Sequence, residues 1–536
     1  MHITSLLLAG YLGAQAVFAA ATAPAAPYVK IGTTKFNGVA TTTKSDAGLP
    51  VTQYLGIKFA AKPTRFSPAT ALALPTGDVD ASKFGAICYQ SFGGPGGAFT
   101  KANFATGTPA ESEDCLNLNI WTPQGTGAAP KGNLPVLFWI YGGSFAFGGS
   151  GQPLHNSTVI AKHDVVVVTA NYRTNVFGFP GASQLPLKEQ NLGLLDQRIA
   201  LQWVKKNILA FGGDPAKITI FGQSAGAVSV ESLVLEGPVA DRPFRAAITQ
   251  SNVASQFLAR PVGPLFNGLA AAVGCDATAT AAQLTCMREK PADALIQAEQ
   301  SLNLPFSIVV DEFTIFSDPV ARRTSGLAAK VPMVIGTMQD EGFMFTLGTA
   351  NFTQFVQATF PGAPVEVVTA LYPIGAGKPY ATDSDAAAAA FRDVVFQCKA
   401  RIDSAIHAVK SNPRVHRYLY QASFANQQII PGLPNGAYHS AELPLEFGFP
   451  IAGSTATELS LGGQIQQALA TYAKNPAAIP GAPVITGKAG NQIAVVARDG
   501  TPSLQNQDDY DKTCQAIWDQ YLLKGKKLTD YGVSIA

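Results

Sequence analysis

Apolar and polar positions along the chain alternate between strand-like and helix-like stretches. Residues 134–141 and 164–170 are apolar at nearly every position, which predicts strands buried on both faces of a sheet. Residues 116–121 alternate apolar with polar side chains, as expected of a strand with one wetter face. Further strand-like runs occupy residues 28–31, 51–59, 218–221, 244–250, 333–336 and 415–421.

Helical patterns between these runs indicate the fold class. Residues 196–209 predict a helix, and residues 211–215 predict the turn that leads into the next strand. This strand–helix–strand order favours an α/β fold, with a large, mostly parallel sheet covered by helices on both faces. No internal repeat or long linker interrupts the pattern, so residues 20–536 are expected to form a single domain.

The segment 218–227 carries the clearest candidate chemistry. Its β-branched run ends at Gly222, Ser224 follows two residues later, and a helical pattern begins after Gly226. This is a Gly-x-Ser-x-Gly nucleophile elbow, in which a tight turn lifts the serine hydroxyl above a sheet. The glycines let strand and helix approach closely, which predicts a sparsely populated backbone conformation at Ser224.

Composition and charge exclude several other functions. The 536 residues are 47% hydrophobic and 14% charged, which is typical of a large folded enzyme rather than a disordered chain. The formal net charge is +2 and no long basic cluster occurs, so nucleic acid is not an expected partner. No Cys-x-x-Cys or His-rich spacing indicates a metal site, and the chemistry of a reactive serine needs no cofactor.

The amino terminus predicts secretion. Residues 3–18 are nearly all apolar or small, and small residues at 17–20 fit a cleavage site, so residues 1–19 are expected to be a signal peptide. A membrane anchor is the alternative, but the run is short and a segment rich in Ala, Thr and Pro follows it. No later stretch predicts a spanning helix, so we expect a secreted protein without a stable membrane anchor.

Six cysteines and two glycosylation motifs fit the same compartment. An even number of cysteines in a secreted chain favours disulfides, although six cysteines allow fifteen pairings. Asn156 and Asn351 each begin an Asn-x-Ser/Thr acceptor motif. We therefore expect an extracellular, disulfide-bonded glycoprotein.

A reactive serine needs a histidine base and an orienting acid. In the elbow topology the chain order is serine, acid, histidine, which leaves His407, His416 and His439. The first lies in a helical pattern and the second on an expected strand, so both are predicted to be surface or core-edge residues. His439 lies in a loop of turn residues, where catalytic groups are usually carried, and is the expected base.

The acid is expected just after a strand between the serine and the histidine. The run 333–336 leads into Asp340 and Glu341, and spacing alone does not choose between these two carboxylates. The other one is expected to be an ion-pair or cap partner. An oxyanion hole needs free backbone N–H groups; we expect one from Ala225 and the others from Gly143 and Ser144 in the glycine turn after the strand 134–141.

These residues together resemble the type-B carboxylesterases, the α/β-hydrolases that include cholinesterases and fungal secreted lipases. The resemblance covers nearly the whole chain after the signal segment. It rests on the motifs at 112–119 (Ser-Glu-Asp-Cys-Leu-Asn-Leu-Asn), 191–198, 221–226, 340–342 and 438–440. It implies that Glu341 is the acid of the triad Ser224, Glu341 and His439. It also implies the disulfides Cys88–Cys115, Cys275–Cys286 and Cys398–Cys514.

Two departures from the family pattern bear on the substrate. Ser144 replaces the usual third glycine of the oxyanion turn, and Gln223 replaces the usual acidic residue before the nucleophile. The loop between Cys88 and Cys115 contains no tryptophan, whereas a cholinesterase-like site uses one there to hold a quaternary ammonium. Together, Gln223 and the missing tryptophan argue against choline esters.

The same loop also bears on whether the protein is an esterase or a lipase. It is rich in glycine and lacks the apolar helical stripe of a lipase lid; Phe92, Phe99 and Phe104 could line a pocket or pack in the core. We therefore expect acyl transfer through Ser224 on soluble short- or medium-chain or aromatic esters. The alternatives are an interfacial lipase or sterol esterase and a non-catalytic adhesion module of the same fold. Nothing in the pattern predicts an oligomeric state.

Overall fold

A computed structural model defines the fold of most of the chain. It describes residues 27–41, 50–93, 97–124, 130–237, 242–410, 414–424, 436–449, 453–477, 479, 481–486, 488, 490–531 and 533. The expected signal peptide, residues 1–19, lies outside the described residues.

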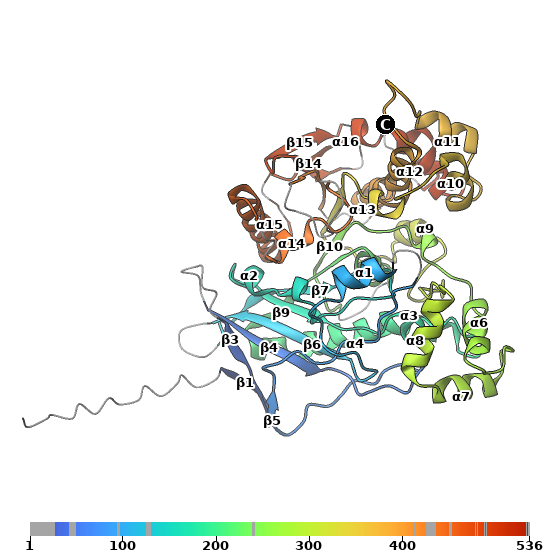
Figure 1. The fold of residues 1–536 in the computed structure, drawn as a ribbon. Coiled ribbons are helices and arrows are strands. Elements are labelled where there is room, and N and C mark those ends of the chain that lie inside the picture. The colour runs from blue at the N-terminus through green and yellow to red at the C-terminus, as the bar shows by residue number, and fades with distance from the viewer. Residues whose placement is uncertain are drawn as a thin grey trace, which may run out of the picture.

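One large sheet organises the described part of the chain (Figure 1). It contains 12 strands, with the order β15-β14-β12-β11-β10-β9-β7-β8-β6-β4-β3 and β13 paired to β12. The strands of this sheet are β3 (Val39–Thr41), β4 (Val51–Lys58), β6 (Asn117–Pro123), β7 (Leu134–Ile140), β8 (Val166–Ala170), β9 (Gly213–Gln223), β10 (Ala246–Gln250), β11 (Met333–Met338), β12 (Val415–Tyr420), β13 (Val484–Ile485), β14 (Gln492–Val496) and β15 (Pro502–Asn506). A small separate sheet holds β1 (Tyr28–Ile31), β2 (Thr34–Asn37) and β5 (Gly77–Asp80).

The centre of the large sheet is parallel. Strands β8, β7, β9, β10, β11, β12 and β14 pair in parallel, and the strands beyond them on each side pair antiparallel. Every residue of β7, β8, β10 and β11 is buried. Because successive side chains point to opposite faces, both faces of this centre are covered. The expected α/β fold class is confirmed.

Helices cover the faces of the central sheet. Helices α4 and α5 contact β9, and α15 contacts both β7 and β9. The first helices are α1 (Gly97–Phe104), α2 (Thr158–Ala161), α3 (Asn175–Gly178), α4 (Leu192–Asn207), α5 (Ala225–Leu235), α6 (Pro264–Ala272), α7 (Ala281–Glu289), α8 (Ala292–Ser301) and α9 (Pro319–Thr324). The others are α10 (Phe352–Thr359), α11 (Val365–Leu371), α12 (Asp383–Arg392), α13 (Cys398–Lys410), α14 (Leu443–Glu446), α15 (Ala456–Lys474), α16 (Gln507–Tyr510) and α17 (Asp519–Leu522).

Element boundaries differ from the sequence pattern at two places near the nucleophile. Helix α4 begins four residues before the expected start at residue 196. The predicted turn at 211–215 is shorter than expected, because β9 already begins at Gly213, which pairs with Leu134 of β7. Gly212 makes this possible with φ 88, and a Cβ there would lie 2.2 Å from the Lys131 carbonyl oxygen.

Three disulfides connect distant segments. They join Cys88 to Cys115, Cys275 to Cys286 and Cys398 to Cys514, so the implied pairing is confirmed. No helix in the described ranges has both the length and the apolar character needed to cross a bilayer.

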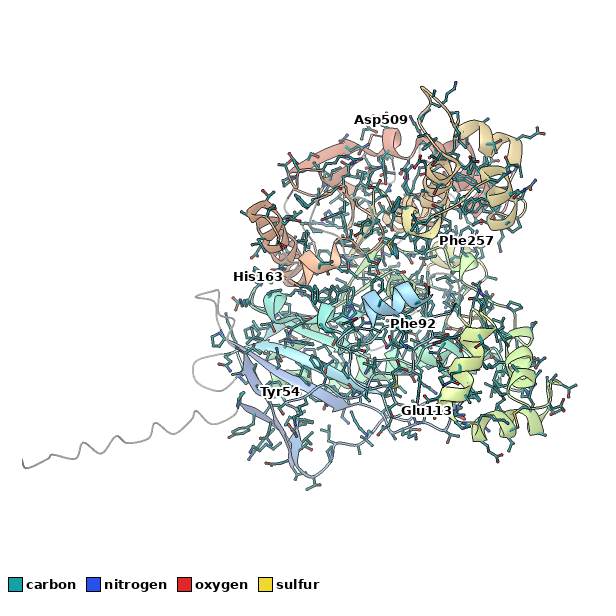
Figure 2. The ribbon with its side chains drawn as sticks, viewed as in Figure 1. Tyr54, Phe92, Glu113, His163, Phe257 and Asp509 are labelled. Atoms are coloured by element: carbon teal, nitrogen blue, oxygen red, sulfur yellow. A yellow bond between two sulfur atoms is a disulfide. The ribbon has the colours of Figure 1, made fainter. Side chains whose placement is uncertain are left out.

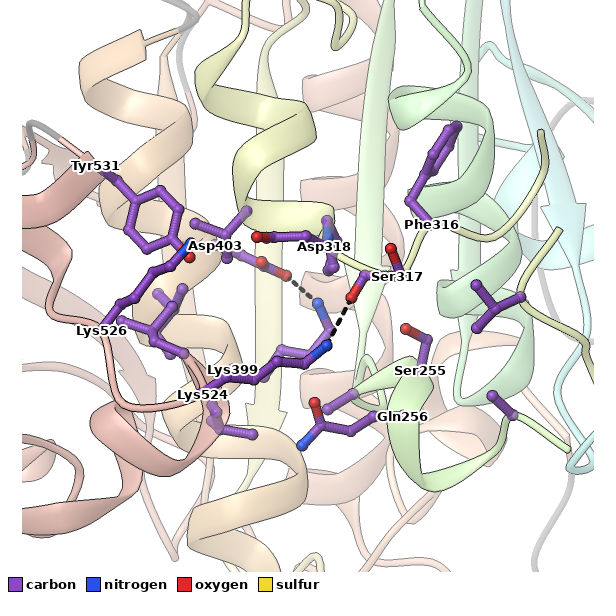
Figure 3. Close-up of a pocket in the computed structure, with 18 residues that line it drawn as sticks. Ser255, Gln256, Phe316, Ser317, Asp318, Lys399, Asp403, Lys524, Lys526 and Tyr531 are labelled. Atoms are coloured by element: carbon purple, nitrogen blue, oxygen red, sulfur yellow. Dashed lines mark hydrogen bonds and ion pairs between the residues drawn. The ribbon is translucent and has the colours of Figure 1, made fainter. Parts of the chain in front are cut away.

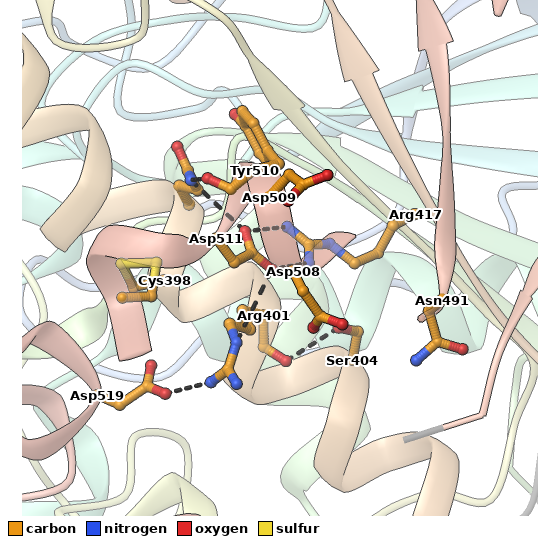
Figure 4. A network of polar contacts seen from close by, with 12 residues as sticks. Cys398, Arg401, Ser404, Arg417, Asn491, Asp508, Asp509, Tyr510, Asp511 and Asp519 are labelled. Atoms are coloured by element: carbon orange, nitrogen blue, oxygen red, sulfur yellow. Dashed lines mark hydrogen bonds and ion pairs between the residues drawn. A yellow bond between two sulfur atoms is a disulfide. The ribbon is translucent and has the colours of Figure 1, made fainter. Parts of the chain in front are cut away.

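Charged side chains surround the disulfide between Cys398 and Cys514 (Figure 4). The carboxylate of Asp511 accepts from Arg417 Nη1 at 2.6 Å, and Arg401 pairs with Asp519. Asp511 is fully buried, so removing its partner would leave an uncompensated charge in the interior. This network and the disulfide together hold the C-terminal segment against α13.

We expect the disulfide between Cys398 and Cys514 to stabilise the protein most. Its half-cystines are 116 residues apart, against 11 for Cys275 and Cys286. Chain-entropy arguments assign about 5 kcal/mol to the longer loop and about 3 kcal/mol to the shorter. The double variant Cys398→Ala/Cys514→Ala should therefore melt at a lower temperature than Cys275→Ala/Cys286→Ala in a thermal unfolding scan. The opposite order would show that loop length does not control their contributions.

Candidate active site

Ser224 lies at the junction between β9 and α5. Its backbone adopts φ 56 and ψ −124, and its N–H donates to the Gln250 carbonyl oxygen at 2.9 Å. A Cβ on Gly226 would lie 2.0 Å from the Ile140 carbonyl oxygen, and one on Gly222 would lie 2.5 Å from the Gly226 oxygen. The strand–turn–helix geometry expected of the elbow is therefore present, and both glycines are sterically required.

The structure brings His439 and Glu341 together from two different strand ends. Glu341 follows β11, and His439 lies in the segment after β12. Nδ1 of His439 lies 2.6 Å from Oε2 of Glu341, while the Met338 N–H donates to Oε1 at 2.9 Å. Glu341 is fully buried, so its position and both its oxygens are constrained by these contacts.

The neighbouring carboxylate, Asp340, binds main-chain groups rather than the imidazole. Asp340 Oδ2 accepts from the Ala437 N–H at 2.9 Å, and the Asp340 N–H donates to the Ala437 carbonyl oxygen at 2.9 Å. Asp340 therefore holds the histidine segment against the end of β11. Of the two carboxylates that spacing left open, only Glu341 contacts the imidazole.

Two aromatic rings flank the imidazole of His439. The ring centroids of Phe345 and Phe396 lie 5.2 Å and 5.0 Å from that of the histidine. These rings restrict the orientations open to the imidazole. The imidazole is consequently held in one orientation, which a base needs for proton transfer.

The other ring nitrogen of His439 has an unexpected partner. Nε2 lies 3.2 Å from Nε2 of the Gln223 side chain. An amide nitrogen can only donate, so Nε2 of His439 accepts and the imidazole proton sits on Nδ1, facing Glu341. The described hydrogen bonds include this contact and none between the Ser224 hydroxyl and His439; in unliganded enzymes such catalytic bonds are often formed only with substrate bound.

The glycine turn after β7 presents its backbone toward the serine. Gly143, Ser144 and Phe145 have φ values of 105, 55 and 60, and such a run of left-handed residues makes a concave nest of N–H groups. A Cβ on Gly142 would lie 3.0 Å from the Ser224 Cβ, so the turn lies against the nucleophile. In the described part of the chain, no hydrogen bond uses the N–H of Gly143, Ser144 or Ala225.

Ser224 opens into a cavity of about 360 Å³. Its lining includes Ser144 and an aromatic group made of Phe257, Phe306, Phe345, Phe391 and Phe396. Figure 2 labels Phe257 of this group. The cavity therefore combines the serine with a wall that is rich in phenylalanine.

The described residues of the loop closed by Cys88 and Cys115 are not among those that line the cavity. The loop contains the short helix α1, which the glycine-rich sequence did not predict. Phe92 and Phe104 pack on Phe147, with ring centroids 5.2 Å and 5.9 Å away. Both side chains are half-buried, and neither is among the described residues that line the cavity or form the buried core. The side chain of Phe99 lies outside the described residues.

A second cavity, of about 320 Å³, lies elsewhere (Figure 3). Its lining includes Lys399 and Asp403, which pair at 2.7 Å, and among the described lining residues none belongs to the Ser224 site. Both charges belong to a buried cluster with Glu231 and Arg323. The four charges balance one another.

His407 is a core residue, so the prediction that it lies at the surface or core edge is wrong, whereas His416 lines a cavity at the edge of the core. His407 is fully buried, its Nε2 lies 2.9 Å from the Val331 carbonyl oxygen, and burial lowers its pKa to about 3. His416 is also buried, with its Nδ1 2.9 Å from the Ala482 oxygen, and burial lowers its pKa. Tertiary packing covers both rings, which the local pattern could not show.

Sequence reasoning missed two buried carboxyls behind the site. Burial raises the pKa of Glu446 to about 7 and that of Glu442 well above its ordinary value. Glu446 Oε2 accepts from Gln250 Nε2 at 2.7 Å, and the Gln250 main chain accepts from Ser224. Their spacing of four residues just after His439 is the signal that could have revealed them.

The remaining predicted positions are placed as follows. Asn156 and Asn351 are both exposed. In the described residues, no group of three or more His, Cys, Asp or Glu side chains is arranged to hold a metal ion.

Comparison with known proteins identifies the family of the chain. The sequence model of the carboxylesterase family matches residues 25–483. Secreted lipase 1 of Botryotinia fuckeliana is 36% identical over 395 residues, 64% of this chain and 67% of that protein. Chlorogenic acid esterase of Aspergillus niger is 33% identical over 413 residues (74% and 73%), and carboxylesterase 5A of Felis catus is 39% identical over 310 residues (56% and 55%). Since the family match spans most of its length, the chain belongs to the carboxylesterase family.

Proposed function

We propose that the protein is a serine carboxylic-ester hydrolase that works through an acyl-enzyme on Ser224. The observation that carries this proposal is the 2.6 Å contact between His439 Nδ1 and Glu341 Oε2, next to an elbow serine that opens into a cavity. This arrangement supplies a nucleophile, a base and an orienting carboxylate.

In the first step, the Ser224 oxygen attacks the ester carbonyl carbon and its proton passes to His439 Nε2. For this, the Nε2 lone pair has to be released by the Gln223 amide. Glu341 stabilises the imidazolium that forms. The N–H groups of Gly143, Ser144 and Ala225 donate to the oxyanion; the carbon–oxygen bond then breaks, and the alcohol leaves with the histidine's proton.

In the second step, water attacks the acyl-enzyme. His439 takes a proton from the water, a second oxyanion forms and collapses, and Ser224 regains its proton as the acid leaves. The two steps use the same donors and the same base. The reaction needs no electron transfer and no further reactant.

We infer a preference for soluble short- or medium-chain or aromatic esters. The cavity of about 360 Å³ is near the lower end of the roughly 300–1,000 Å³ usual for ligand pockets, and its wall is aromatic. An interfacial lipase or sterol esterase is the second candidate, because a secreted lipase is among the relatives. A catalytically inactive adhesion module is disfavoured by the complete set of catalytic side chains.

We further propose that residues 1–19 are removed and that residues 20–536 are secreted as one domain. The secreted relative and the three disulfides support this. Asn156 and Asn351 are proposed as glycosylation sites, since both are exposed. The expected partner is a small-molecule ester.

The triad predicts a graded loss of activity. Ser224→Ala should abolish labelling by a fluorophosphonate and lower kcat/KM on 4-nitrophenyl butyrate by at least about 10⁴-fold. Glu341→Gln should cost about 10³- to 10⁴-fold, because the imidazolium loses its charged partner. Asp340→Asn is the matched control, since an amide oxygen can still accept from Ala437, and should stay within about tenfold. Labelling of Ser224→Ala equal to that of the native protein would refute the proposal.

Gln223→Glu should shift the pH profile. A carboxylate beside Nε2 favours the protonated imidazole, which cannot act as a base, so the acidic limb of kcat/KM should move up by about one pH unit. Gln223→Met, which is neutral and of similar size, should leave the limb in place. A shift shared by both variants would mean that the altered packing, rather than charge, is responsible.

Chain-length dependence separates the esterase from the lipase. Hydrolysis of 4-nitrophenyl esters from acetate to palmitate should be fastest for acyl chains of about four to eight carbons, in clear solution, because the cavity is small. Adding an emulsion should not activate the enzyme. Activity confined to long chains at an oil–water interface would instead establish the lipase.

A further inference from the structure

The wall of the Ser224 cavity contains one positive charge. Among the described residues that line the cavity, Arg260 is the only ionisable side chain. The other lining groups are aliphatic or aromatic side chains and the hydroxyls of serine and threonine. Arg260 is half-buried, and a charge beside such apolar groups interacts more strongly with a ligand than a fully solvated charge does.

Main-chain oxygens hold one edge of the Arg260 guanidinium. Nε donates to the Pro305 oxygen at 3.2 Å, and Nη1 donates to the Phe257 and Ala259 oxygens at 3.2 Å and 3.1 Å. The Arg260 N–H also donates to the Ile308 oxygen at 2.8 Å. These contacts fix the side chain between the segment after β10 and the segment 305–308, which both contribute to the cavity.

Among the described residues, the guanidinium has no acidic partner. No ion pair of Arg260 occurs among the described residues, whereas the buried Arg173, Arg323 and Arg417 are each paired with a carboxylate. Burial lowers the pKa of Arg260, with no contribution from an acidic side chain. Nη2 makes no hydrogen bond to the described residues, so its two N–H groups are available to a ligand.

We propose that Arg260 binds a carboxylate of the substrate, so that the enzyme prefers aromatic esters that carry a carboxylate remote from the scissile bond. The inference rests on the proposed function, because it assumes that ester hydrolysis at Ser224 takes place in this cavity. Arginine suits the task, since its planar N–H groups match carboxylate geometry. The aromatic wall packs on the ring of the substrate while Arg260 selects its charged end.

Two pairs of substrates test the proposal. 4-Acetoxybenzoate and 4-acetoxybenzamide place a charged or a neutral group on the leaving alcohol. Mono-4-nitrophenyl terephthalate and 4-nitrophenyl 4-carbamoylbenzoate place the same two groups on the acyl part. In at least one pair, kcat/KM should be about 10- to 100-fold higher for the carboxylate, as expected for a hydrogen-bonded charge pair. The pair that shows this preference identifies the part of the substrate that Arg260 contacts.

Arg260→Gln should lower the ratio of kcat/KM for the carboxylate substrate to kcat/KM for the matching amide by about 10- to 100-fold. Arg260→Lys should retain part of this preference, because a lysine keeps the charge without the planar fork. An arginine that only braces the chain would lower both values together and leave the ratio unchanged. Arg322→Gln is the matched control: Arg322 also donates to main-chain oxygens, of Leu235 and Glu236, and does not line the cavity. Its ratio should equal that of the native enzyme.

A measurement on the native enzyme keeps the test decisive if the variants fail to fold. Benzoate should inhibit hydrolysis of 4-nitrophenyl acetate at about 10-fold lower concentration than benzamide. Equal inhibition by benzoate and benzamide, together with no carboxylate preference in either substrate pair, would overturn the inference about Arg260. The proposed function would still stand in that case, provided that the enzyme hydrolyses the neutral esters. Failure to hydrolyse any of these esters would refute the proposed function, and this inference with it.

Discussion

The whole site depends on the close approach of helix α5 to the end of strand β7. Gly226 lies so near the Ile140 carbonyl that a Cβ would come within 2.0 Å of its oxygen. This contact starts the helix directly after the strand and leaves Ser224 at φ 56. Such a conformation costs about 1–3 kcal/mol and persists only where its surroundings over-determine it. At Ser224, the sheet and helix α5 fix this backbone conformation from opposite sides.

The order of the strands brings the remaining groups to the serine. Strands β12, β11, β10, β9 and β7 are consecutive neighbours in the sheet, and their carboxyl ends lie along one edge because they are parallel. The oxyanion turn follows β7, Ser224 follows β9, and Gln250 at the end of β10 accepts the serine N–H. Glu341 follows β11 and His439 follows β12, so parallel pairing assembles a site from five separate segments.

Gln223, Glu442, Glu446 and Arg260 influence the charge near the serine. Gln223 places a neutral amide beside His439, at a position where the family resemblance implies an acid. Burial raises the pKa values of Glu442 and Glu446, which favours their neutral forms. Arg260 then stands as the one ionisable group on the described cavity wall. These features agree in disfavouring cationic substrates, and they are consistent with an anionic one.

The sequence by itself determined strands β4 and β6 to β12, the elbow at Ser224 and the order of serine, acid and histidine, because these follow from local periodicity and turn residues. The family resemblance added the choice of Glu341 and the disulfide pairing. Only the tertiary structure decided that His407 and His416 are buried and that Gln223 contacts His439. It also showed that Arg260 lines the cavity and has no acidic partner among the described residues. Gln223 and His439 are 216 residues apart in the chain, and contacts over such separations depend on packing that no local pattern encodes.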